Sequence, residues 1–107
     1  MKNGDKISAV VTVDVPQFSN LMFDSNGDNQ FASKPNGQQF ELGVVPFTVH
    51  ALWTFNYRPW NAQVNFYVNG QLDPTQTYKT PTSPLPVGPL SIPDVHRVTF
   101  NIAADPA

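Results

Sequence analysis

Two short segments hold the side chains whose types and spacing suit chemistry, and the first is an acidic turn. Asp24, Asn26 and Asp28 place hard oxygen atoms at alternate positions, as the start of a calcium-binding loop does. Asn29 stands where such a loop has glycine, and Pro35 stands where it has its bidentate glutamate. The alternatives are a calcium site of low affinity and a solvated turn in which Asp and Asn side chains cap their own backbone.

The second segment is Tyr57-Arg58-Pro59-Trp60-Asn61. A tryptophan on a loop offers a flat ring on which the apolar face of a sugar stacks, and Arg58 and Asn61 beside it supply hydrogen-bond donors. Tyr57 precedes them at the end of an expected strand. The alternative is that Trp60 closes the end of the core, with Arg58 stacked on an aromatic ring.

Catalytic constellations are poorly represented in the sequence. His50 and His96 are far apart, no Gly-x-Ser-x-Gly motif positions a nucleophile, and Glu41 has no obvious carboxylate partner for glycoside hydrolysis. The chain has no Cys, which excludes disulfides, zinc–thiolate sites and thiol nucleophiles. We therefore expect a protein that binds rather than an enzyme.

The elements that must position these residues show a period of two, which is typical of strands. Apolar residues alternate with polar ones over residues 7–15, 47–57, 64–68 and 98–102, and more weakly over 18–23 and 38–45. The eleven Pro leave few windows long enough for a helix. The pattern predicts an all-β fold without substantial helix. We expect one antiparallel β-sandwich domain over residues 1–107, immunoglobulin-like or jelly-roll-like, with about seven strands.

The loop at 58–61 predicts how the strands on either side of it pair, residue by residue. If it joins two paired strands as a hairpin, Trp53 lies opposite Phe66 and Thr54 lies opposite Asn65. Apolar residues then meet apolar residues on one face, and polar residues meet polar ones on the other. The polar face would form a flat surface of His50, Thr54, Asn56, Gln63, Asn65 and Tyr67.

The Asn69-Gly70 dipeptide predicts a two-residue hairpin turn, which pairs Tyr67 with Leu72. Leu52 would complete an apolar row with these two residues on the polar face. Such a row indicates a partner sheet or a homo-oligomer interface.

Residues 79–93 hold five Pro and cannot form a central strand. The segment is expected to be an extended crossover between the two sheets, with Leu85, Val87, Leu90 and Ile92 along the core edge. The alternative is a polyproline ligand for an aromatic groove.

The amino-acid composition argues against some classes of binding partner. Charged residues make up 13% of the chain and the net charge is −2, which argues against nucleic-acid binding. No apolar run is long enough to insert in a membrane, and the first residues do not resemble a signal peptide.

The leading hypothesis is a lectin-like, carbohydrate-binding module with a glycan or protein partner. The alternative is a structural or assembly protein of a virion, a phage tail or a cell-surface fibre, and both favour an extracellular or virion-surface location.

Overall fold

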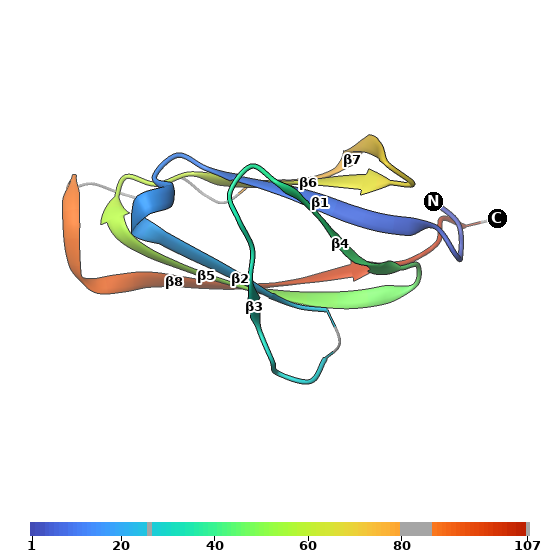
Figure 1. Ribbon diagram of the computed structural model, residues 1–107, viewed down its shortest axis with the longest axis horizontal. Helices are drawn as coiled ribbons and strands as arrows, with labels where there is room; N and C mark the ends of the chain where they lie inside the picture. The colour runs from blue at the N-terminus through green and yellow to red at the C-terminus, as the bar shows by residue number, and fades with distance from the viewer. Residues whose placement is uncertain (26, 80–86, 107) are drawn as a thin grey trace.

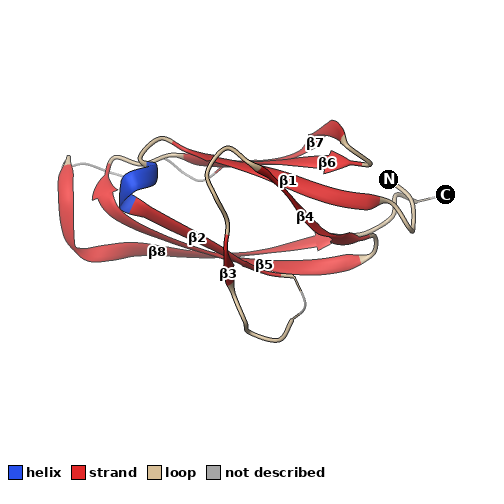
Figure 2. Ribbon diagram, in the orientation of Figure 1, coloured by secondary structure: helices blue, strands red, loops and turns tan. Residues whose placement is uncertain are grey.

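The computed structural model describes residues 1–25, 27–79 and 87–106. These residues form eight strands and one short 3₁₀ turn at Pro16–Phe18, which is the single blue element in Figure 2. The strands are β1 (Lys6–Val13), β2 (Ser19–Asp24), β3 (Ala32–Ser33), β4 (Gln39–Val44), β5 (Phe47–Arg58), β6 (Ala62–Val68), β7 (Gln71–Lys79) and β8 (Gly88–Ile102).

The strands form two antiparallel four-stranded sheets that pack face to face. One sheet has the order β4-β1-β6-β7 and the other has the order β3-β2-β5-β8. Figure 1 shows β1, β6 and β7 in one layer above β2, β5 and β8 in the other, with both chain ends at the same end of the sandwich. The predicted all-β sandwich is confirmed, with the two-residue β3 as an additional strand beyond the seven expected.

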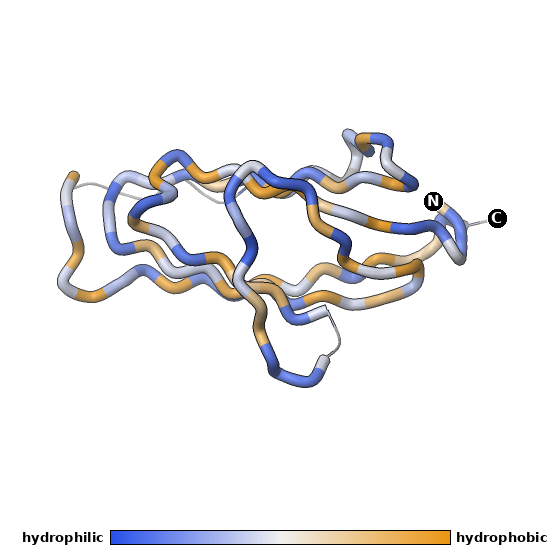
Figure 3. Tube along the Cα trace, in the orientation of Figure 1, coloured by the Kyte–Doolittle hydropathy of each residue, from blue (hydrophilic) through white to orange (hydrophobic). Residues whose placement is uncertain are grey.

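The core lies between the sheets. Figure 3 shows hydrophobic and hydrophilic residues following one another along the strands. Alternate residues of β1, β5 and β6 are buried because successive side chains of a strand point to opposite faces. The buried residues of these three strands that face the core are Ile7, Ala9, Val11, Val49, Ala51, Trp53, Phe55, Ala62, Val64 and Phe66. Ser8 is also buried, at 8% exposed, but it lies on the opposite face of β1 from Ile7 and Ala9. Edge-to-face contacts extend this core, as between Phe66 and Phe100, whose ring centroids lie 5.2 Å apart.

The predicted hairpin of residues 51–68 is wrong. β5 pairs with β2 and β8, whereas β6 pairs with β1 and β7. Trp53 and Phe66 are both buried, but they belong to opposite sheets. The alternating pattern shows that each strand has one apolar face. It does not show whether two such strands lie side by side in one sheet or face each other from two sheets. Three connecting residues at about 3.3 Å each also span the ~10 Å between packed sheets.

The Asn69-Gly70 turn is confirmed. Tyr67 lies opposite Leu72, and both turn residues have the positive φ that this hairpin requires, 50° for Asn69 and 86° for Gly70. The apolar row with Leu52 is wrong, because Leu52 lies on β5 in the other sheet, opposite Met22 and Arg97.

The Pro-rich segment joins the two sheets, as expected, since β7 ends at Lys79 and β8 begins at Gly88. Leu85 and the prolines among residues 80–86 lie outside the described residues. Pro89 and Pro93 lie in β8, an edge strand, where a missing backbone donor is tolerated. Val87 and Ile92 do not line the core, since they are 63% and 80% exposed.

Within the described ranges, the structure has no helix that is long and apolar enough to cross a membrane.

Candidate functional site

Trp60 lies inside the protein. Its side chain is 2% exposed, and its indole stacks on Phe55 with ring centroids 4.0 Å apart and an interplanar angle of 4°. His96 contacts the same indole edge-to-face at 4.7 Å. The hypothesis that Trp60 offers an exposed sugar-stacking face is therefore wrong, and its ring closes the end of the core instead.

An ion pair holds this end of the sandwich together. Arg58 donates from Nε to Oδ2 of Asp94 at 2.8 Å and from a terminal nitrogen to Oδ1 at 2.7 Å. The indole nitrogen of Trp60 donates to Oδ2 at 2.9 Å. The hydrogen bonds from Arg58, and then the one from Trp60, lower the pKa of Asp94 to about 2. Arg58 is thus committed to Asp94 rather than free for a ligand.

Tyr57 is also engaged with its neighbours. Its ring stacks on that of Phe18, with centroids 5.0 Å apart and planes inclined by 16°. Both residues lie near the 3₁₀ turn, so this stack fastens that turn to the end of β5.

Asn61 is the one residue of the predicted loop site that is exposed and oriented by a fixed partner. Its backbone N–H donates to Oδ1 of Asp14 at 2.8 Å, and its side-chain amide donates to Oδ2 at 3.1 Å. The backbone N–H of Asp14 donates in return to the carbonyl oxygen of Asn61 at 3.1 Å. Because three hydrogen bonds join the two residues, the Asp14 carboxylate has a defined orientation at the surface.

The Asp14–Asn61 pair borders an open depression of about 450 Å³, which we call the Asp14 depression. Thr12 of β1, Gln63 of β6 and Lys79 of β7 line it as well. These three residues lie opposite one another in adjacent strands, so they form one row across the outer face of the β4-β1-β6-β7 sheet. A carboxylate, two amides, a hydroxyl and an ammonium group thus converge on one surface.

Polar side chains continue from the depression along the same face. Gln63 donates to the side-chain oxygen of Asn65 at 2.7 Å, and Thr77 donates to the same oxygen at 3.3 Å. These bonds hold the outward side chains of β6 and β7 in place. The predicted flat polar surface is therefore present only in part, because His50, Thr54 and Asn56 lie on β5 in the other sheet.

The acidic turn at 24–28 binds its own backbone. Asp24 is 1% exposed, and its carboxylate oxygens accept N–H groups from Gly27 and Asn29, each at 2.9 Å. Asp28 accepts the N–H of Gln30 at 3.0 Å. Asn26 lies outside the described residues. Among the described residues, His, Cys, Asp and Glu side chains form no group of three that could hold a metal ion.

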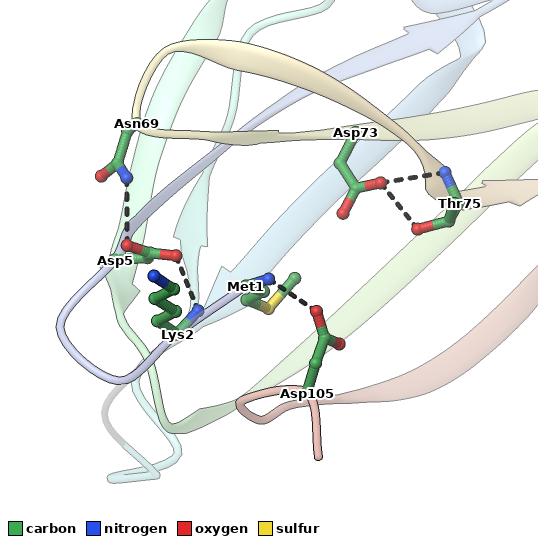
Figure 4. Close-up of polar contacts among 7 residues, drawn as sticks. All are labelled: Met1, Lys2, Asp5, Asn69, Asp73, Thr75 and Asp105. Carbon is green, nitrogen blue, oxygen red and sulfur yellow. Dashed lines mark hydrogen bonds and ion pairs between the residues drawn. The ribbon is translucent and has the colours of Figure 1, made fainter. Parts of the chain in front are cut away.

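A second acidic cluster surrounds the N-terminus (Figure 4). The α-amino group of Met1 lies 2.6 Å from Oδ2 of Asp105, and this hydrogen bond raises the pKa of the amino group. Asp5 accepts the backbone N–H of Lys2 at 2.7 Å, which is the main cause of its lowered pKa. Asp73 accepts both the N–H and the hydroxyl of Thr75. Asp5 and Asp73 thus bind groups two or three residues away in the chain, and Asp105 pairs with the α-amino group of Met1.

Sequence reasoning missed Asp14 and Asp94. Each lies far along the chain from the loop that it contacts, by 47 residues for Asp14 and Asn61 and by 34 for Asp94 and Trp60. Only the pairing of β1 with β6 and of β5 with β8 brings them together. Neither residue stands in a motif, so the sequence offers no signal for them.

Comparison of the chain with known protein families, with curated protein sequences and with solved structures gives no match. Its function must be inferred from the geometry of its surface.

Proposed function

We propose that this chain is a non-catalytic, lectin-like module that binds carbohydrate at the Asp14 depression. The observation that supports the proposal is the Asp14 carboxylate, which Asn61 orients through two hydrogen bonds beside Gln63 and Lys79. Sugar recognition requires fixed donors and acceptors that meet adjacent hydroxyl groups.

The chemistry of the lining matches that requirement. A carboxylate accepts hydrogen bonds from hydroxyls, an ammonium group donates to them, and an amide does both. Gln63 and Lys79 lie on paired strands rather than on a loop, which lowers the conformational entropy lost on binding. Within the described part of the chain, the side-chain oxygen of Gln63 has no hydrogen-bond partner, so it is available to a ligand.

The same residues favour binding over hydrolysis. Glycoside hydrolysis ordinarily needs two carboxyl groups on either side of the scissile bond. Asp14 is the one carboxylate among the described residues that line the depression, so those residues do not supply such a pair. We therefore propose no catalytic role for this chain.

A glycan array probed at high protein density tests the proposal. We expect a defined set of glycans to bind, and Gln63→Ala and Lys79→Ala each to lower affinity at least about tenfold, which corresponds to about 1.4 kcal/mol. Thr99→Ala, on the outer face of the other sheet, is the matched control and should bind like the unmodified protein. A blank array, or equal losses in all three variants, would refute the proposal.

One observation favours a second candidate, the structural or assembly protein. Ile92 is 80% exposed and Val95 is 60% exposed, and both lie on the edge strand β8. An exposed apolar edge is a surface that a second copy of the chain could cover. Light scattering across a concentration series tests this candidate. A dimer that Ile92→Asp dissociates would support it, and a monomer at all concentrations would refute it.

A further inference from the structure

The sheet that carries the Asp14 depression has a second hollow on its outer face. This hollow, which we call the Ser8 groove, has a volume of about 720 Å³ and is lined by residues that include Lys6, Ser8, Gln39 and Glu41. Gln39 donates to the hydroxyl oxygen of Ser8 at 2.7 Å. Ser8 lies opposite Glu41 in the β1–β4 ladder, so a hydroxyl, an amide and a carboxylate adjoin here as well.

β1 connects the two hollows. Its residues Ile7, Ala9 and Val11 are buried in the core, and the alternation places Lys6, Ser8, Val10 and Thr12 on the outer face, where Ser8 is only 8% exposed. Lys6 and Ser8 line the Ser8 groove, and Thr12 lines the Asp14 depression. At about 3.4 Å per residue, the distance from Lys6 to Thr12 is roughly 20 Å. A single compact sugar cannot contact both hollows at once.

An aromatic ring lies beside this path. Tyr67 is directly opposite Ser8 on one side and opposite Leu72 on the other, and it is only half-buried. Leu72 is 52% exposed. A tyrosine ring has an apolar face and a polar hydroxyl, which suits the alternating apolar and hydroxylated surfaces of a sugar ring. Tyr67 is therefore a better candidate than the buried Trp60 for stacking against a sugar ring.

The charges along the path cancel. Lys6 and Glu41 border the Ser8 groove, while Asp14 and Lys79 border the Asp14 depression. Each hollow therefore carries one group of each sign and no excess of either. A ligand rich in sulfate or carboxylate would meet as much repulsion as attraction, whereas an uncharged chain would use both kinds of group as hydrogen-bond partners.

We propose that the ligand is an extended, uncharged polysaccharide that lies along β1, from the Asp14 depression across Tyr67 to the Ser8 groove. This inference rests on the proposed function. It adds that recognition requires several consecutive sugar units and that the chain must be neutral.

The test is a length series of neutral cello-, manno- and chito-oligosaccharides, from disaccharide to hexasaccharide, with polygalacturonate as the anionic probe. We expect affinity by calorimetry to rise at least about tenfold from the disaccharide to the hexasaccharide that binds best, a gain of about 1.4 kcal/mol. We expect no binding of polygalacturonate.

Single substitutions distinguish the contribution of the Ser8 groove to affinity from that of the Asp14 depression. Glu41→Ala should weaken the hexasaccharide at least about tenfold and leave the disaccharide unchanged, whereas Gln63→Ala should weaken both. Tyr67→Ala should weaken the hexasaccharide, and Tyr67→Phe, which keeps the ring, should restore most of its affinity. Melting temperatures of all variants check that each one folds, and Thr99→Ala on the other sheet is the control for surface substitution.

The outcomes distinguish the two proposals. Affinity that does not depend on length, together with a loss in Gln63→Ala and none in Glu41→Ala, would overturn the extended site and leave the Asp14 depression as the binding site. Preferential binding of polygalacturonate would overturn the neutral class of ligand. Failure of every oligosaccharide here and of every glycan on the array would overturn both proposals.

Discussion

The indole of Trp60 lies flat on the phenyl ring of Phe55, with centroids 4.0 Å apart and planes inclined by 4°. The stack joins the loop between the two sheets to the central strand β5, and the Trp60–Asp94 hydrogen bond ties the same loop to β8. Because Trp60 is 2% exposed, we expect Trp60→Ala to leave a cavity and to lower the free energy of unfolding by about 3–5 kcal/mol. Urea denaturation measures this loss.

The matched control is Tyr57→Ala, which removes the neighbouring aromatic stack. Phe18, its partner, is 40% exposed, so we expect a loss of only about 1 kcal/mol. Equal losses in the two variants would show that Trp60 does not anchor this end of the core.

The ion pair at the same end predicts a response to acid. The pKa of Asp94 falls from 3.8 to about 2 in the folded protein, mainly through Arg58. A carboxyl group with a lowered folded pKa contributes stability that is fully present above its unfolded pKa and is lost as the pH falls through the folded pKa. The protein should therefore lose this contribution between about pH 4 and pH 2.

Asp94→Asn isolates the contribution of the Asp94 carboxylate. The variant should be less stable than the unmodified protein at pH 7, because a neutral amide binds Arg58 more weakly than a carboxylate does. The difference in melting temperature between the two proteins should shrink from pH 4 to pH 2. A constant difference over that range would contradict the assignment of the shift to Asp94.

The strands were predictable because burial leaves a direct trace in the sequence. Phe55 and Val64 each lie between two polar neighbours, and each is buried as the alternation requires. The Asn69-Gly70 turn was equally local, since a tight hairpin depends on the φ values of its own two residues.

The pairing of β5 with β8 was not predictable, because it depends on a contact between distant segments. Alternation fixes which face of each strand is apolar, but two apolar faces match equally well side by side and across a core. For the same reason the sequence could not place Asp94 beside Trp60, and it could not show that Trp60 is buried.

The core itself gives a third prediction. Trp53 is 1% exposed and Phe66 is 2% exposed, so Trp53→Ala and Phe66→Ala should each cost about 3–5 kcal/mol. Thr54 points to the outer face, and Thr54→Ala should cost under about 1 kcal/mol. Comparable shifts of the urea midpoint for Thr54→Ala and Trp53→Ala would show that the two faces of β5 are inverted.

Trp53 adds a sharper comparison. Within the described part of the chain its indole nitrogen is buried and has no hydrogen-bond partner, which costs about 1–3 kcal/mol. Trp53→Phe removes this unpaired donor and keeps an aromatic ring in the core. We expect it to cost less than half of what Trp53→Ala costs, and an equal cost would show that indole volume alone determines stability at this position.

The acidic turn gives the last prediction. Both carboxylate oxygens of Asp24 accept backbone N–H groups, and the side chain is 1% exposed, so a calcium ion would have to displace those bonds and open the turn. We therefore expect millimolar calcium to leave the melting temperature unchanged, and Asp24→Ala to lower the free energy of unfolding by about 1–3 kcal/mol through the unpaired N–H groups of Gly27 and Asn29. Asp28→Asn, at an exposed carboxylate that caps one N–H, should change stability by less than about 1 kcal/mol.

A native state that binds calcium would instead melt at a higher temperature in its presence, since a ligand specific to the folded state stabilises it by mass action. If calcium raises the melting temperature and both substitutions abolish the rise, the turn is a cation site and the backbone cap is only its ion-free form.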